Sequence, residues 1–363
     1  MSLIKKSTIR DIMTILVITF LLITLVNFAF VYYSPKIVKN LPVIVAGSIL
    51  PCYRTLYHYD GKNLSQTNFV FGDSFSEGAG DEFLSSDPEY GIFNKLKDTK
   101  SSALIFGRGG YGNIGTVMEF KHCYPLLSTY TDFNTDEIIR SQVTFVFYEG
   151  NDLNNNLVEK ERKFNELTYK IRFFLPVYEF MFKELRRLLK IFGDYINDEL
   201  EKPKNENPLT NNFFEAYKDT YPQSAATELN DDELDKSVNL LMSSLDSIKT
   251  MLPDAYNFLL LYIPSVTSSY EINGKLKVQS YQGNEYFETT GEFNDQRSRY
   301  IREVISSYLD KNDWHFCDTT SSILSLTREG IPVHGPLDWK HLNKKGYHAV
   351  AYAYSKCLDM IKT

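Results

Sequence analysis

Five short apolar segments, separated by helical or turn-rich stretches, constrain the fold of this chain more than any other feature. They span residues 68–71, 103–106, 143–148, 258–263 and 314–317. Short runs of Phe, Val, Leu and Ile that alternate with helical stretches are typical of a parallel sheet with helices on both faces. The sequence therefore predicts a three-layer α/β/α domain built on a five-stranded parallel sheet.

The third and fourth predicted strands are separated by more than a hundred residues. One crossover helix needs far fewer, so we expect a long insertion at about 153–250. It contains a basic amphipathic stretch at 170–190, which could pack on the core, lie on a membrane, cap a site or bind a partner. Residues 194–235 turn acidic and are expected to form a loop or lid, followed by a helix over about 231–251.

The N-terminus carries a second strong pattern, because residues 12–35 contain no charged side chain. This is about the length that crosses a bilayer, and it predicts a transmembrane anchor over 12–33. Lys5, Lys6 and Arg10 precede it, which places residues 1–11 in the cytoplasm and the later chain outside. Residues 34–66 are then a stalk and residues 67–363 the main domain. A cleaved signal peptide is less favoured, because no small-x-small cleavage site follows.

Charge and cysteine content limit the partners and cofactors. The net charge of -7 argues against a nucleic-acid partner, whose phosphates require a basic surface. Cys52, Cys123, Cys317 and Cys357 permit up to two disulfides with three possible pairings, while buried free thiols are an equally open alternative. Their wide spacing matches no metal-site pattern, so we expect no metal and no other cofactor.

The first predicted strand ends in Gly72-Asp73-Ser74. The carboxyl ends of parallel strands are where open α/β sheets bind ligands, so a tight turn there would lift the Ser74 hydroxyl onto the rim of the sheet. Ser74 is therefore the candidate nucleophile. A serine needs a base to remove its proton.

Asp338-x-x-His341, near the C-terminus, offers such a base on a turn that leads into a predicted final helix. Asp338 could accept from one ring nitrogen of His341 while the other nitrogen faces Ser74. Attack on a carbonyl also requires donors for the developing oxyanion. The glycine run 107–112 follows the second strand and Asn151 follows the third, so both are candidates for that role.

These motifs together resemble the SGNH, or GDSL-type, hydrolase superfamily. The matching blocks are 72–74, the glycines near Gly110, 150–152 and the Asp338/His341 pair. The resemblance implies a flavodoxin-like fold, with Ser74 as nucleophile, His341 as base and Asp338 orienting it. It also implies an oxyanion hole formed by the Ser74 backbone N–H, Gly110 and Asn151. Ile105 departs from the Asn frequent in the family before the second block, which leaves the choice between Gly109 and Gly110 open.

Four further residues are candidates for a substrate pocket, namely Asp73, Gly109, Asp152 and His334. Of these, Asp73 is expected to brace the turn rather than to catalyse.

The resemblance and the anchor together imply a membrane-anchored serine esterase or O-acyltransferase that acts outside the cytoplasm. The expected substrates are O-acyl esters of carbohydrate, with acetyl as the expected acyl group. Two alternatives remain: a lipid esterase, and a catalytically silent glycan-binding scaffold of an export complex. The expected partners are the bilayer, an O-acylated glycan or lipid, and a membrane acyl donor or polysaccharide-export protein.

Overall fold

The computed structural model describes residues 13–15, 17–26, 29, 52, 67–78, 102–127, 141–161, 221–253, 255, 257–279, 286–335 and 338–362. The chain divides into two compact units, and the larger comprises Thr55–Phe164 and Asn207–Thr363. The sheet and helices below belong to that unit, which contains the candidate site.

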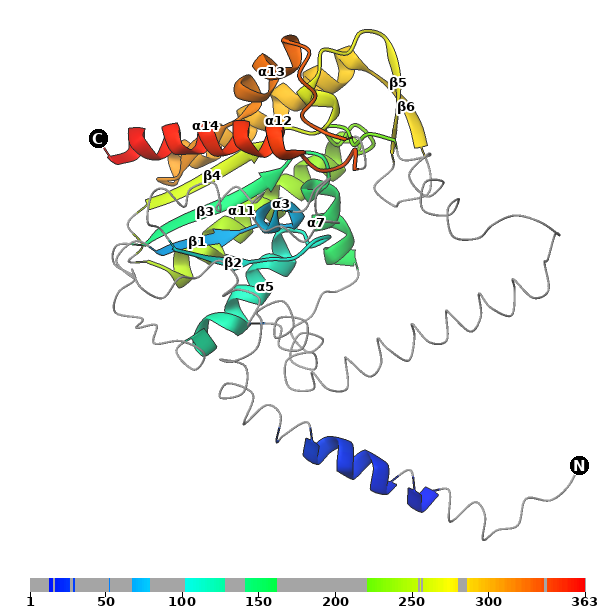
Figure 1. Cartoon of the computed structure of the whole chain (residues 1–363), viewed down its shortest axis with the longest axis vertical. Helices are drawn as coiled ribbons and strands as arrows, with labels where there is room; N and C mark the ends of the chain where they lie inside the picture. The colour runs from blue at the N-terminus through cyan, green and yellow to red at the C-terminus, as the bar shows by residue number, and fades with distance from the viewer. Residues whose placement is uncertain are drawn as a thin grey trace, which may run out of the picture. The chain divides into compact units, whose positions relative to one another are not determined.

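A five-stranded parallel sheet forms the middle layer of this unit, as predicted (Figure 1). The strand order is β2-β1-β3-β4-β7, so the chain starts near the centre and adds strands on both sides. All four strand pairs are parallel. The strands are β1 (Thr67–Phe71), β2 (Ser102–Phe106), β3 (Gln142–Tyr148), β4 (Asn257–Ile263) and β7 (His315–Asp318). The fifth strand begins one residue later than predicted.

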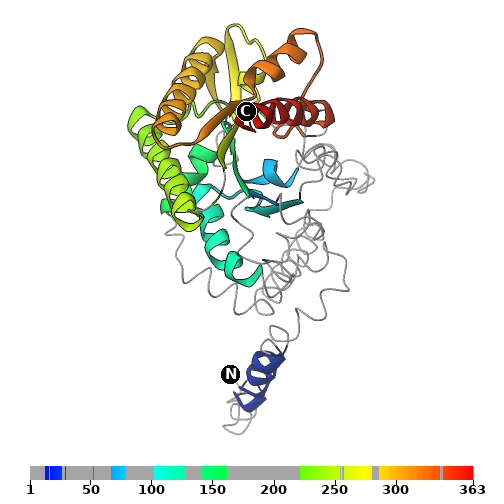
Figure 2. The ribbon, with the colours of Figure 1, turned by 90° about the vertical axis from the view of Figure 1, so that its left-hand side faces the viewer.

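Helices cover both faces of the sheet, and Figure 2 shows them on its two sides. One side carries α5 (Asn113–Cys123), α7 (Asp152–Glu161), α11 (Asp231–Met251) and α12 (Gly291–Lys311). The other carries α14 (Lys344–Lys362), which packs beside α13 (Thr320–Arg328). Short helices α3 (Ser74–Glu77), η6 (Tyr124–Leu126) and η8 (Thr267–Ser269) complete the unit.

The two faces of the sheet differ in chemistry because side chains alternate along each strand. One face is aromatic: Phe120 of α5 contacts Phe69, Phe71 and Phe106 with ring centroids 4.8 to 6.4 Å apart. The other face is mostly aliphatic and forms one buried cluster with α14. Its members include Val70, Ile105, Val146, Leu259, Leu261, Val350 and Tyr354.

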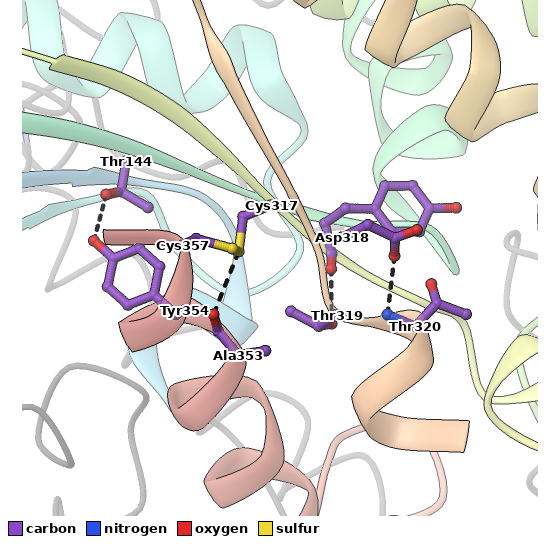
Figure 3. The surroundings of a disulfide bond; sticks show 9 residues. Thr144, Cys317, Asp318, Thr319, Thr320, Ala353, Tyr354 and Cys357 are labelled. Carbon is purple, nitrogen blue, oxygen red and sulfur yellow. Dashed lines mark hydrogen bonds between the residues drawn. A yellow bond between two sulfur atoms is a disulfide. The ribbon is translucent and has the colours of Figure 1, made fainter. Parts of the chain in front are cut away.

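A disulfide joins the last strand to the last helix, between Cys317 and Cys357 (Figure 3). The hydroxyls of Thr144 in β3 and Tyr354 in α14 form a hydrogen bond of 2.6 Å nearby. The sequence left open whether Cys317 and Cys357 are free thiols or paired, and the structure pairs them with each other. None of the four cysteines is free.

The sequence did not predict the antiparallel hairpin of β5 (Lys275–Gln279) and β6 (Tyr286–Thr290) that follows β4. The helix predicted over about 231–251 is confirmed as α11, and an Asn230/Glu233 capping box begins it. The ends of the predicted insertion, α7 and α11, pack against each other and against α5 in the helical layer. The amphipathic stretch at 170–190 lies outside the described residues.

The predicted anchor is described only in part. Residues 13–15, 17–26 and 29 are helical, and their large apolar side chains are mostly 52 to 68% exposed. Within the described residues, the longest apolar helical stretch falls short of a membrane span. Most of the stalk over 34–66 lies outside the described residues.

Candidate active site

Ser74 stands where β1 gives way to α3, at the carboxyl edge of the sheet. The backbone of the neighbouring strand comes very close at this point, because Gly72 N–H donates to the Phe106 carbonyl at 3.1 Å. A Cβ on Gly107 would lie 1.6 Å from the Gly72 oxygen, so only glycine fits there. Asp73 caps α3 by accepting from the Phe75 N–H at 2.9 Å. The turn is thereby fixed from both sides.

Ser74, His341 and Asp338 come together as the sequence predicted. Ser74 Oγ lies 2.8 Å from His341 Nε2, and His341 Nδ1 lies 2.6 Å from Asp338 Oδ2. A carboxylate only accepts, so Nδ1 carries the proton that bonds to Asp338, and Nε2 is left to accept from the serine hydroxyl. This is the tautomer that a general base requires.

The carboxylate of Asp338 is held in its ionised form. Burial alone would raise its pKa, but the hydrogen bond and charge attraction of His341 lower the pKa to about 2. The backbone N–H groups of Lys340 and His341 add to this by donating to Asp338 Oδ1 at 2.8 and 3.2 Å. The carboxylate therefore keeps one orientation and one charge across the physiological range.

Two aromatic residues that the sequence reasoning missed support the histidine. The Phe75 ring lies 5.1 Å from the His341 ring and stacks on Tyr148 at 3.9 Å. The Tyr148 hydroxyl donates to the Lys340 carbonyl at 3.2 Å, which ties β3 to the loop that bears His341. Phe75 follows the nucleophile directly and Tyr148 ends a predicted strand, so their positions in the sequence were the available signal.

The predicted oxyanion donors gather at the same edge. Asn151 Nδ2 donates to Asp73 Oδ2 at 3.2 Å, so one amide hydrogen is engaged with the turn of the nucleophile. The other amide hydrogen can serve an oxyanion. Gly109 is adjacent to the serine, because a Cβ on it would lie 3.5 Å from Ser74 Cβ.

The Gly109 N–H already donates to Glu77 Oε2 at 3.1 Å. The neighbouring Gly110 has a φ of +78°, which suits the third position of the turn that the Tyr111 N–H closes on the Arg108 carbonyl. The bond to Glu77 favours Gly110 over Gly109 as the backbone donor.

Asp73 and Asp152 support the turns at the ends of β1 and β3. Both are 1% exposed, and Asp152 Oδ2 accepts from the Tyr148 N–H at 2.9 Å. Burial and the nearby Asp73 carboxylate raise the pKa of Asp152 well above its usual range. Burial also raises the pKa of Asp73, which the Phe75 N–H and His341 partly offset. The expectation that Asp152 lines a substrate pocket finds no support in these contacts.

His334 is 1% exposed, so the structure offers no support for a pocket position either. Burial lowers the pKa of its ring to about 3, which keeps the ring neutral. The ring lies 5.8 Å from that of Tyr270. Asn343 Nδ2 donates to the His334 carbonyl at 3.2 Å, which ties this segment to the start of α14.

The glycine loop is held by α7 through contacts that the sequence reasoning did not foresee. Glu159 accepts from the N–H groups of Gly112 and Gly115 at 2.8 and 2.9 Å. Asn155 and Asn156 also bond to the loop, at the Tyr111 carbonyl and the Asn113 N–H. Three polar residues on one helix therefore position the loop that carries Gly109 and Gly110. The signal was the polar run 154–156 followed by a glutamate.

Glu159 is expected to make stability depend on pH. Burial raises its pKa from 4.5 to about 7, although both glycine N–H groups oppose this. Between these two values the folded state binds more protons than the unfolded state, so stability falls as pH rises through the interval. From pH 5 to pH 8, the free energy of unfolding should fall by about 2 kcal/mol relative to that of Glu159→Gln.

Chemical denaturation at both pH values measures this difference. Glu161→Gln, at the exposed end of the same helix, is the matched control and should follow the wild-type profile. Parallel profiles for wild type and Glu159→Gln would contradict the assignment of a raised pKa to Glu159.

Comparisons with known proteins find distant structural neighbours. No protein-family model and no curated protein matches the chain. A lipolytic G-D-S-L family protein from Veillonella parvula is 10% identical, with 80% of this chain and 97% of that one covered and a TM-score of 0.36. A lipase from a goat rumen metagenome is 13% identical, with 80% of this chain and 96% of that one covered and a TM-score of 0.38. An acetylxylan esterase from Geobacillus stearothermophilus is 8% identical, with 81% of this chain and 93% of that one covered and a TM-score of 0.35.

These three proteins are what the chain is similar to in fold. TM-scores this low carry no argument about activity. What bears on chemistry is the chain's own arrangement. Ser74, Gly109 and Asn151 follow three adjacent strands, and Ser74 meets the His341 ring that Asp338 holds.

Proposed function

We propose that the protein is a serine esterase or O-acyltransferase that works through an acyl-Ser74 intermediate. The observation that carries the proposal is the Ser74–His341–Asp338 chain of hydrogen bonds, at 2.8 and 2.6 Å. His341 would take the Ser74 proton as the hydroxyl oxygen attacks the ester carbonyl. It would return that proton to the departing alcohol and then activate the second acceptor, which is water or another hydroxyl.

The tetrahedral intermediate would place its oxyanion near Asn151 and Gly110. Donors of this kind lower the barrier because they are already aimed at the site where charge develops. Asp73 orients the Asn151 amide by accepting a hydrogen bond from it, and Glu159 of α7 holds the glycine loop. The site thus provides a nucleophile, an oriented base and oxyanion donors, which are the parts that acyl transfer needs.

We further propose that the substrate is an O-acetylated carbohydrate outside the cytoplasm and that residues 12–33 anchor the protein in the membrane. The motif resemblance at residues 72–74, 150–152 and 338–341, together with the predicted anchor, supports this proposal. The exposed apolar side chains of residues 17–26 suit a segment that contacts lipid. Lys5, Lys6 and Arg10 give the orientation.

One labelling experiment tests the chemistry and the location together. Spheroplasts that express the full chain are treated with a membrane-impermeant fluorophosphonate, which reacts with activated serines. We expect stoichiometric labelling of Ser74 in the membrane fraction and about 100-fold slower labelling of His341→Ala. Product analysis with an acetylated oligosaccharide then separates free acetate from transfer to a second sugar.

Failure to label the folded, full-length protein even after lysis would refute the serine mechanism. Labelling only after lysis would refute the location while leaving the chemistry intact. Turnover of long-chain acyl esters in preference to acetyl esters would refute the carbohydrate substrate.

A further inference from the structure

The loop that carries Asp338 and His341 also exposes a tryptophan. Trp339 directly follows Asp338, and its side chain is 42% exposed. Among the described residues of the segment 331–343, Trp339 is the large hydrophobic residue whose side chain is exposed. The residues on either side of it in the sequence, Asp338 and Lys340, are charged.

The position of the Trp339 ring is fixed by the backbone. Gly335 has a φ of +68°, and a Cβ there would lie 2.9 Å from Cε2 and Cζ2 of the indole. The ring therefore packs directly on the Gly335 backbone, where only glycine leaves room. The Gly335 N–H donates to the Asp338 carbonyl at 3.1 Å, which closes the loop beneath the ring. The indole pays little conformational entropy on binding a ligand, because it is already held.

The same short loop fixes the distance between this ring and the reacting groups. Asp338 Oδ1 accepts from the N–H groups of Lys340 and His341, so residues 338–341 form one tight turn. Tyr148 and Asn343 hold this turn from outside, through the Lys340 and Gly335 carbonyls. A group stacked on Trp339 would consequently keep a constant position relative to His341 and to Ser74.

The chemistry of the ring and its flanks selects the ligand. An aromatic face is electron-rich and attracts the weakly positive C–H groups that a pyranose presents on one side of its ring. The sugar hydroxyls at the edge would meet polar neighbours, which here are Asp338 and Lys340. An acyl chain would need a wider continuous apolar surface than one ring with charged flanks. A sugar ring therefore fits this surface better than a lipid tail.

We propose that Trp339 is a stacking platform for a pyranose ring of the O-acylated glycan and holds its ester over Ser74. This inference rests on the carbohydrate substrate proposed above. The platform binds the sugar next to the ester, so small esters without a sugar make no use of it.

Tryptophan fluorescence tests binding without any turnover. The chain has two tryptophans, and Trp314 is only 3% exposed. Acrylamide quenching of the full-length Ser74→Ala protein therefore reports mainly on Trp339. Acetylated oligosaccharides of xylose, N-acetylglucosamine and mannuronate backbones serve as probes. We expect at least one of them to protect the fluorescence from acrylamide, and Ser74→Ala/Trp339→Phe to lose this response.

Kinetics supply the second measurement. For Trp339→Ala, the ratio of kcat/KM for the acetylated oligosaccharide to that for an aryl acetate should fall about 10-fold. Trp339→Phe keeps an aromatic face and should recover most of the ratio. Tyr352→Ala, which removes an aromatic side chain that is 61% exposed on α14, is the matched control and should leave the ratio unchanged.

The outcomes separate this inference from the proposed function. Turnover of the glycan with no protection and an unchanged ratio in Trp339→Ala would overturn the platform and leave the esterase intact. An equal loss on both substrates would show a purely structural role and would also overturn it. Protection by a glycan that is never deacylated would support the platform and contradict the carbohydrate ester. No protection by any of the three backbones would overturn the platform.

Discussion

Replacing Ser74 by alanine is expected to lower kcat for an aryl acetate by about 10⁴-fold or more. In the proposed mechanism this hydroxyl forms the acyl intermediate, and His341 has no proton to take without it. The measurement is steady-state hydrolysis by the purified full-length protein, with circular dichroism and thermal unfolding as checks on the fold. Because Ser74 is 7% exposed and small, the substitution leaves little empty space and should preserve the fold.

The matched control is Ser244→Ala. Ser244 is also buried, but its hydroxyl donates to the Leu240 carbonyl within α11, away from the site. This variant should keep kcat within about 2-fold of wild type, because the bond it loses affects only local stability. Unchanged kcat in Ser74→Ala would remove this serine from the mechanism and would favour a scaffold that binds without catalysing.

Asp338→Asn is expected to lower kcat by about 10³- to 10⁴-fold while preserving the structure of the loop. The amide would present N–H to His341 Nδ1 and so reverse the tautomer, which places the ring proton on Nε2. Nε2 could then no longer accept the hydrogen bond of the Ser74 hydroxyl, which lies 2.8 Å from it in the wild-type protein. Because the pKa of Asp338 is about 2, the loss should be nearly constant between about pH 5 and pH 9.

Asp359→Asn controls for the change of net charge. Asp359 is exposed on the same helix, α14, that follows the loop. This variant should retain wild-type kcat at each pH. If Asp338→Asn loses less than about 10-fold, the aspartate does not orient the base, and the base must be held by Tyr148 and Phe75 alone.

The strands could be predicted because their signal is local. Each consists of a short apolar run that is followed within two residues by glycine, proline or aspartate. Burial on both faces removes any need for polar alternation. The helix at Asp231–Met251 could be predicted for a similar reason, since the acidic residues 231–233 suit the N-terminal end of a helix. Its apolar positions then repeat at helical spacing.

The hairpin β5–β6 was not predictable by the same reasoning. Its strands contain exposed Lys277 and Glu288 and only two buried positions, Val278 and Thr289. Such a sequence matches a polar loop as well as it matches a strand. Pairing across the hairpin decides the structure, and pairing depends on residues that are not adjacent in the sequence.

The hydrogen bonds that support the site could not be predicted from the sequence either. Glu159 and the Gly112 N–H are 47 residues apart, and Tyr148 and Lys340 are 192 apart. Glutamate on a helix is usually a solvated surface residue, so the polar run 154–156 before Glu159 does not by itself identify this glutamate as a buried acceptor. The competition between Gly109 and Gly110 was open for the same reason, because the bond from Gly109 to Glu77 depends on how two loops meet.

The sequence by itself determined the layers of the domain and the candidates for the reacting residues, because apolar periodicity and short motifs record local preferences. It placed Ser74, Asn151 and the Asp338/His341 pair at strand ends or at the start of the last helix. Only the tertiary structure decided how these residues meet. It set the tautomer of His341, the role of Asp152 as a buried support, the Cys317–Cys357 bond and the exposed Trp339 ring. These features depend on distances between segments far apart in the chain, which are set by packing of the sheet against α7 and α14.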